Sequence, residues 1–103
     1  MQHDVFANPA PRTHAAFPFI AVLQADLSAE GRSRVIAPMA PRAALPGAAG
    51  RLLPIVQHNG REFLLATELM TSLPISALGN PLGSIAVHRD AIAQAVDWLF
   101  TGI

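Results

Sequence analysis

The ionisable side chains of this 103-residue chain stand at spacings that predict no catalytic or metal centre. The four histidines are scattered, with no pair at metal-ligand spacing. They are His3, His14, His58 and His88. There is no cysteine, so thiolate metal sites and disulfides are excluded. The acidic residues form no evident catalytic pair, and no nucleophile elbow, P-loop or glycine-rich dinucleotide loop occurs. We therefore expect no metal, no cofactor and no catalysis.

Two arginines suggest one alternative function, the cleavage of RNA. Arg32 and Arg34 lie two residues apart at the start of a predicted strand, so their side chains leave it on the same face. With His58, they could grip and cleave an RNA phosphate. However, seven basic residues balance seven acidic ones, and a net charge of zero provides no general attraction to nucleic acid or anionic lipid. This balance favours a solvated strand edge as the interpretation of the two arginines.

Strands are expected over most of the chain before residue 85. The predicted strands cover residues 4–7, 17–27, 33–38, 51–58 and 61–70. The second is apolar on both faces as far as Gln24, which is typical of a central strand. The third is expected to end at Pro38. Asn59 and Gly60 provide the positive φ angles of a type I′ turn, which would join the last two strands as a hairpin.

Loops separate these strands. The segments 8–16 and 38–50 are rich in Pro and Ala and are expected to be loops. Residues 71–85 are rich in turn formers, with at most short strand pieces at 75–78 and around Leu82.

A helical period replaces the strand pattern from Ile85 onward. The apolar stripe of this helix consists of Ile92, Val96, Leu99, Phe100 and Ile103. Ser84 is the expected N-cap, Asp90 is an acid near the first turn, and Gly102 is expected to end the helix in a left-handed conformation. Trp98 lies outside the stripe. It is expected either under a loop or at a dimer seam, or else exposed as an anchor for a partner.

Strands followed by one helix predict a mainly β fold, a small antiparallel barrel with a C-terminal α-helix, in one domain over residues 1–103. Hydrophobic residues make up 51% of the chain and charged residues 14%, so we expect apolar surface that a partner covers, and favour an oligomer. The chain shows no signal peptide and no apolar stretch of 18 residues, so no membrane span is expected and a cytoplasmic location is favoured.

The ordered set of segments resembles the CcdB family of toxins from bacterial toxin–antitoxin modules. The segments that carry the resemblance are "QHDVFANP", "VLQADL", "RVIAPM", "PIVQHNGREFLL", "ELMTSLPISALG" and "AIAQAVDWLFTGI". They follow in the family's order over nearly the whole chain. The resemblance implies a homodimer of SH3-like barrels, each with a C-terminal helix. It also implies a toxin that binds the A subunit of DNA gyrase and traps the enzyme on cleaved DNA, without catalysis, and that a CcdA-like antitoxin neutralises.

The resemblance further implies which residues meet gyrase. Carried over by position, they are Thr101, Gly102 and Ile103, with Asp97 one turn earlier and Leu27 after the second strand. The best-known family pattern has Trp directly before Gly-Ile, whereas Thr101 stands here. We expect Trp98, one helical turn from Thr101, to share the target surface. We also expect the chain to need no polar tail after Ile103, so that the target can close over its end.

Contacts with the antitoxin are expected on the two loops, at Arg12, His14 and Arg42. Two alternatives stay open. One is a ribonuclease toxin on the same barrel, related to MazF and Kid, which would use Arg32, Arg34 and His58. The other is a dimeric adaptor without toxicity.

Overall fold

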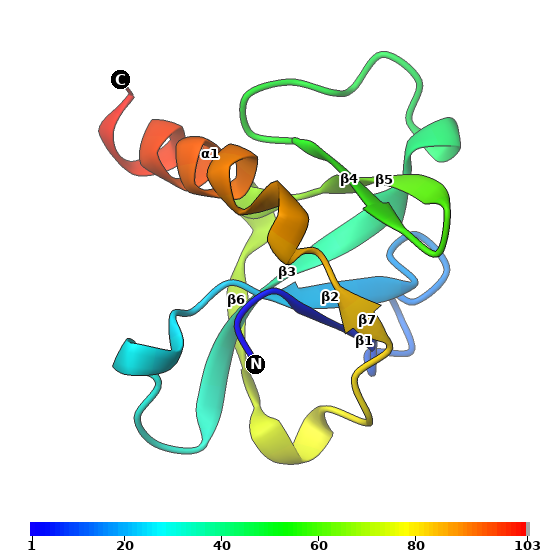
Figure 1. The fold of residues 1–103 in the computed structure, drawn as a ribbon. Helices are drawn as coiled ribbons and strands as arrows, with labels where there is room; N and C mark the ends of the chain where they lie inside the picture. The colour runs from blue at the N-terminus through cyan, green and yellow to red at the C-terminus, as the bar shows by residue number, and fades with distance from the viewer. Residues whose placement is uncertain (103) are drawn as a thin grey trace.

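A computed structural model describes residues 1–102, so Ile103 lies outside the described residues. Within that range, seven strands form one antiparallel sheet that curls into a nearly closed barrel, and one α-helix packs beside it (Figure 1). The strands are β1 (Asp4–Ala7), β2 (Phe19–Val22), β3 (Ser33–Pro41), β4 (Ile55–His58), β5 (Arg61–Leu65), β6 (Thr71–Pro74) and β7 (Gly83–Ser84). The helix α1 spans Arg89–Thr101. The expected mainly β barrel with a C-terminal helix is confirmed.

Strand β3 connects the two halves of the barrel because it pairs with three other strands. One edge of β3 pairs with β2, and the other pairs first with β6 and then with β5. The expectation that Pro38 ends this strand is wrong. The Pro38 carbonyl accepts the N–H of Ala66 at 2.8 Å. The N–H and C=O of one residue leave an antiparallel strand on the same side. An N–H of residue 38 would therefore point to the edge of β3 where its partner changes from β6 to β5. Proline lacks this N–H, and no ladder bond is lost there.

Strand β2 is central and apolar on both faces, as predicted. Ala21 belongs to the main core inside the barrel, with Met39, Phe63 and Leu65 among its members. On the other face, Ile20 joins a smaller cluster with Phe6, Val22 and Ile36, which Leu73 and Leu78 cover.

The strand β2 is shorter than predicted, because a side chain takes over its pairing with β3. Gln24 Oε1 accepts the N–H of Val35 at 3.1 Å, and Gln24 Nε2 donates to the Ser28 carbonyl at 2.9 Å. The chain then turns through a short 3₁₀ helix, η1 (Asp26–Ser28). The predicted strand over 17–27 is therefore correct only at 19–22.

The region after the hairpin differs most from the sequence-based expectation. The type I′ turn itself is confirmed, with φ of 52° at Asn59 and 74° at Gly60. Strand β5 ends at Leu65 instead of residue 70, because the buried Thr67 donates its hydroxyl to the Leu52 carbonyl at 2.6 Å and the chain turns into a 3₁₀ helix, η3 (Thr67–Leu69). A strand then forms at Thr71–Pro74, and residues 75–77 form a 3₁₀ turn instead of the predicted strand piece.

The helix begins later and buries less than predicted. A 3₁₀ turn, η5 (Ala86–His88), precedes α1, and the Ser84 hydroxyl accepts the N–H of Ala86 at 3.1 Å, so Ser84 caps this turn and not α1. Gly102 ends α1 as predicted, with φ of 69° and its N–H donating to the Trp98 carbonyl at 2.9 Å.

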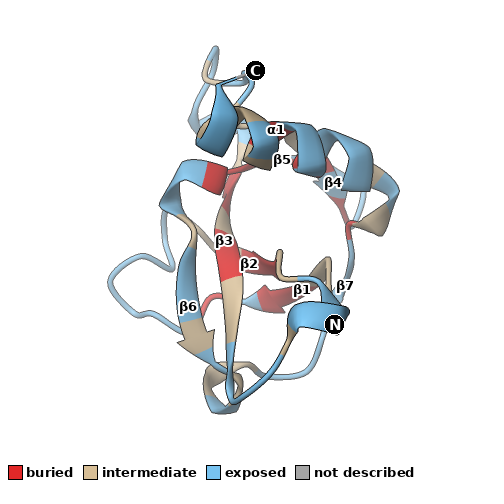
Figure 2. Ribbon diagram, turned by 90° about the vertical axis from the view of Figure 1, so that its left-hand side faces the viewer, coloured by how far each residue is buried: buried red, intermediate tan, exposed pale blue. Residues whose placement is uncertain are grey.

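The predicted apolar stripe of α1 is correct only in part. Ile92 is buried, but Phe100 is 71% exposed, so its assignment to the core is wrong. The last turn extends past the barrel wall that the middle of α1 covers (Figure 1), and the outward face of α1 is exposed along its length (Figure 2).

The barrel stays open between its edge strands β4 and β7, and two histidines bridge this seam. His58, at the end of β4, is 5% exposed and lies against Gly83 of β7, where a Cβ atom would stand 3.2 Å from the His58 ring. The His58 ring also packs edge-on against Phe19, with centroids 4.8 Å apart. The N–H of Gln57 in β4 donates to Nε2 of His88 at 3.0 Å, a bond that requires an unprotonated Nε2.

Protonation of His58 is expected to destabilise the seam. Burial lowers the pKa of His58 below its ordinary value of 6.5. The unfolded chain therefore binds this proton more readily than the folded chain. The stability that His58 contributes is complete above pH 6.5 and is lost as the pH falls from there through the lower folded pKa.

The measurement is the free energy of unfolding by urea at pH 7 and pH 5. We expect His58→Phe to lose less stability on acidification than the unchanged chain does. His3, whose pKa burial also lowers, adds to the same slope, so His3→Gln is the comparison. An unchanged pH dependence in His58→Phe would contradict the role given to this side chain.

Candidate functional site

The last turn of α1 projects from the barrel and leaves four exposed residues, Asp97, Phe100, Thr101 and Gly102, here called the helix end. Figure 1 shows this turn extending away from the strands. Thr101 donates its hydroxyl to the Asp97 carbonyl at 2.6 Å, so the hydroxyl is already satisfied within the helix. The large apolar group of this surface is Phe100. The spacing of Phe100 fits the buried stripe, so the sequence gives no signal that this side chain lies at the surface.

Leu27 lies on a separate element that approaches the same helix. It is fully exposed, at 101%, on η1. The Asp26 carboxylate holds η1 against the N-terminus, since it accepts the N–H of Gln2 at 3.1 Å. Just before η1, Leu23 lines a shallow cleft together with Asp97 of α1. The chain segment that leads to Leu27 therefore runs next to α1.

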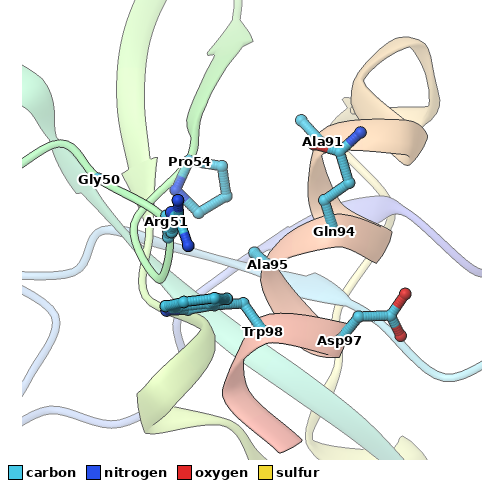
Figure 3. Close-up of a pocket in the computed structure, with 8 residues that line it drawn as sticks. All are labelled: Gly50, Arg51, Pro54, Ala91, Gln94, Ala95, Asp97 and Trp98. Atoms are coloured by element: carbon cyan, nitrogen blue, oxygen red, sulfur yellow. The ribbon is translucent and has the colours of Figure 1, made fainter. Parts of the chain in front are cut away.

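A groove of about 550 Å³ separates α1 from the segment that leads into β4. Its lining residues are Gly50, Arg51, Pro54, Ala91, Gln94, Ala95, Asp97 and Trp98 (Figure 3). The Arg51 guanidinium lies over the Trp98 ring, 4.0 Å from its centroid. Trp98 is thus partly buried beside a loop, which agrees with the first of the two sequence-based interpretations. The sequence offers no signal for this pairing, because 47 residues separate the two.

The three residues predicted to meet the antitoxin are exposed on two loops. Buried Asn8 orders the first loop, since its amide donates to Thr13 Oγ1 at 3.0 Å and to the Phe17 carbonyl at 2.8 Å. His14 on this loop places Nδ1 2.9 Å from the Asn8 carbonyl. On the second loop, Arg42 forms an ion pair with Glu62 at 3.0 Å.

These two loops are neighbours in space. Because Phe19 pairs with Met39, the loops that adjoin β2 and β3 leave the same end of the sheet. Arg12, His14 and Arg42 therefore lie at one end of the sheet. Figure 1 shows the first loop and the start of the second on the side opposite the C-terminal end of α1, and the second loop then runs back toward α1.

The residues of the ribonuclease alternative do not come together. The Arg34 guanidinium donates to the carbonyls of Gly31 and Ser33 at 3.0 and 2.8 Å. His58 lies against Phe19, which pairs with Met39, five residues from Arg34 along β3, or about 16 Å. A buried histidine among aromatic rings and a distant arginine form no phosphate site.

Neither a metal site nor a membrane helix is evident between residues 1 and 102. No three His, Asp or Glu side chains in this range lie close enough to share a metal ion. The one α-helix found there is too short to cross a bilayer.

The comparison with protein families agrees with this architecture. A family model described as the CcdB protein matches residues 2–102, which is nearly the whole chain. No match was found among curated proteins. Because the family match spans the barrel, the loops and α1 together, the chain belongs to the CcdB family, the gyrase poisons of toxin–antitoxin systems, which act by binding and not by catalysis.

Proposed function

We propose that this chain poisons DNA gyrase by placing the helix end against the A subunit, as a homodimer that acts in the cytoplasm. The observation that carries the proposal is the exposure of Asp97, Phe100, Thr101 and Gly102 on a turn that the barrel does not cover. Such a turn can enter a cleft of a large partner without any change in the barrel. Leu27, fully exposed on η1, is the second proposed contact. Ile103, the third member of the family's terminal contact, lies outside the described residues.

Phe100 supplies the aromatic area that Thr101 lacks. The family pattern places Trp at the position of Thr101, and exposed aromatic side chains dominate many binding hot spots. Phe100 is the next residue along the chain and is 71% exposed. Trp98, in contrast, is partly buried and has Arg51 over its ring. The contribution of Trp98 to target binding stays a prediction, and the variants below separate it from that of Phe100.

The family implies a CcdA-like antitoxin as the second partner. We propose that it covers the end of the sheet where Arg12, His14 and Arg42 are exposed. Arg42 and Glu62 are both about half-exposed, so their ion pair contributes little to stability and can be exchanged for contacts with a partner.

The homodimer is supported by apolar side chains that the isolated chain leaves in water. Leu69, on η3 beside α1, is 51% exposed. Apolar groups of this size gain about 25 cal/mol for each Å² that a second copy covers. We therefore propose that Leu69 lies in the contact between the two copies.

Substitutions at the helix end are expected to change gyrase inhibition without changing the fold. Phe100→Ala should weaken inhibition of supercoiling about tenfold, and Thr101→Trp should strengthen it by a similar factor, because each changes the aromatic area offered to the target. Val87→Ala is the control, since Val87 is 81% exposed on η5, at the opposite end of α1. Equal inhibition by Phe100→Ala and the unchanged chain would show that the helix end is not the contact surface.

Trp98→Ala tests a different property. Because Trp98 packs against the 50–54 segment, its loss is expected to lower the free energy of unfolding by about 2 kcal/mol. Gyrase inhibition, compared at equal concentrations of folded protein, should fall less than in Phe100→Ala. If inhibition collapses while stability is unchanged, Trp98 is the target contact and Phe100 is not.

The oligomeric state is measured by light scattering coupled to size-exclusion chromatography. We expect a particle of twice the 10.9 kDa chain mass at micromolar concentration. Leu69→Arg should shift it to the monomer, because a cation would be buried without a partner. Leu45→Arg, in the exposed loop before Gly50, should leave the mass unchanged. A monomeric unchanged chain would disprove the dimer.

A further inference from the structure

We propose that the groove between α1 and the segment that leads into β4 binds an extended, acidic segment of the antitoxin, which joins the sheet as an additional strand beside the start of β4. This inference rests on the proposed function only in taking the antitoxin as the partner. The groove itself follows from the register of β4, the small side chains of α1 and the position of Arg51.

The register of the β4–β5 hairpin leaves hydrogen-bonding groups on the outer edge of β4. His58 and Arg61 flank the two-residue turn and form its closing hydrogen-bonded pair. Bonded pairs alternate along an antiparallel ladder, so Val56 is bonded to β5, while Ile55 and Gln57 direct their N–H and C=O groups outward. Two further bonds agree with this register, from the Leu65 N–H to the Pro54 carbonyl at 3.0 Å and from the Gln57 N–H to His88 at 3.0 Å.

The backbone N–H and C=O groups on the outer edge of β4 face the helix. Gln57 reaches His88, the residue directly before α1, so the outer edge of β4 faces the start of α1. Ile55 points the same way two residues earlier, and its N–H makes no hydrogen bond to any residue between 1 and 102. A strand that enters here gains a donor and an acceptor from Ile55, as sheet edges offer to peptides in general.

The facing surface of α1 leaves room for such a strand. Near its start, the helix contributes the small Ala91 and Ala95 and the longer Gln94 to the lining of the groove, and Asp97 and Trp98 follow one turn later (Figure 3). Trp98 stands at one end of the lining. Pro54 is the lining residue next to β4, so a segment in the groove lies beside the start of that strand, at Ile55.

Arg51 determines the chemistry of the occupant. No carboxylate between residues 1 and 102 forms an ion pair with Arg51, and its guanidinium makes no hydrogen bond in that range. Stacking on Trp98 holds the planar group in place and leaves its N–H edge available, the geometry that suits a carboxylate with two oxygens. Asp97 lines the same groove, but its carboxylate points away from Arg51 (Figure 3). An Asp or Glu side chain of the bound segment therefore pairs with Arg51.

The position of the groove favours the antitoxin over the other possible occupants. The loop that carries Arg42 runs directly into Gly50 and Arg51, so a segment bound at that loop continues into the groove without leaving the surface. Of the helix end, Asp97 lines the groove, whereas Phe100, Thr101 and Gly102 lie beyond Trp98, so gyrase can contact these three residues while the groove is filled. A second copy of this chain would have to insert one of its own extended segments, and this outcome is tested below.

The experiment fills the groove from α1 and measures both partners. Ala91→Trp places an indole over the outer edge of β4, and Ala93→Trp makes the same change at another exposed alanine of α1 that does not line the groove. Binding is measured by calorimetry with the purified antitoxin encoded beside this chain, and gyrase inhibition is measured in parallel. We expect Ala91→Trp to bind the antitoxin at least about tenfold more weakly and to inhibit gyrase normally, and Ala93→Trp to match the unchanged chain in both assays.

Two further measurements do not depend on a bulky substitution. The amide of Ile55 should exchange with solvent more slowly in the antitoxin complex than in the free chain, because it becomes a ladder donor. Each Asp or Glu of the antitoxin is replaced in turn by Asn or Gln, and the binding of each variant is measured to the unchanged chain and to Arg51→Ala. One replacement should weaken binding to the unchanged chain but not to Arg51→Ala. The residue replaced in that variant is the partner of Arg51.

The inference is overturned if Ala91→Trp, with an unchanged melting temperature, binds the antitoxin as tightly as the unchanged chain. It is also overturned if this variant loses gyrase inhibition or changes its oligomeric state instead, since the occupant is then gyrase or a second copy. The proposed function fails in a different way. In that case the unchanged chain itself neither inhibits gyrase nor binds the antitoxin.

Discussion

The packing of α1 against the open side of the barrel is the interaction on which the rest of the structure depends. Ile92 of α1 belongs to the same buried cluster as Val5 of β1, Val56 of β4 and Ile85, which follows β7, so one apolar cluster joins the helix to both sides of the seam. Full burial of a side chain of this size stabilises by about 1.5–3 kcal/mol. Because this contact lies in the first half of α1, the helix is anchored near its start and its last turn is left free.

That anchoring explains why the two surfaces of α1 differ. Near its start, η5 places His88 within hydrogen-bond distance of β4, and the seam between β4 and β7 is closed by side chains instead of a backbone ladder. In the middle, the small side chains of α1 leave unfilled the space beside the segment that leads into β4, and this space is the groove. At its end, Gly102 stops the helix beyond the barrel wall. A binding toxin can thus offer separate surfaces to two partners from one rigid element.

Sequence reasoning succeeded where the signal is local. Asn59 and Gly60 specify their turn because few other residues accept two consecutive positive φ angles, and the two-sided apolar pattern of β2 identifies a central strand. It failed where a distant group decides. Pro38 continues its strand because the partner of β3 changes at that point. The chain leaves β5 early because the Thr67 hydroxyl bonds to Leu52, fifteen residues away.

The sequence by itself therefore determined the mainly β class, the hairpin, the terminal helix with its glycine cap, and the family. Only the tertiary structure decided that Phe100 is exposed, that Arg51 lies over Trp98, and that two histidines bridge the open seam. The physical reason is that a period of apolar residues shows which face of a helix can be buried, but not how far the barrel extends beneath it. Contacts across 30 or more residues depend on where the whole sheet closes.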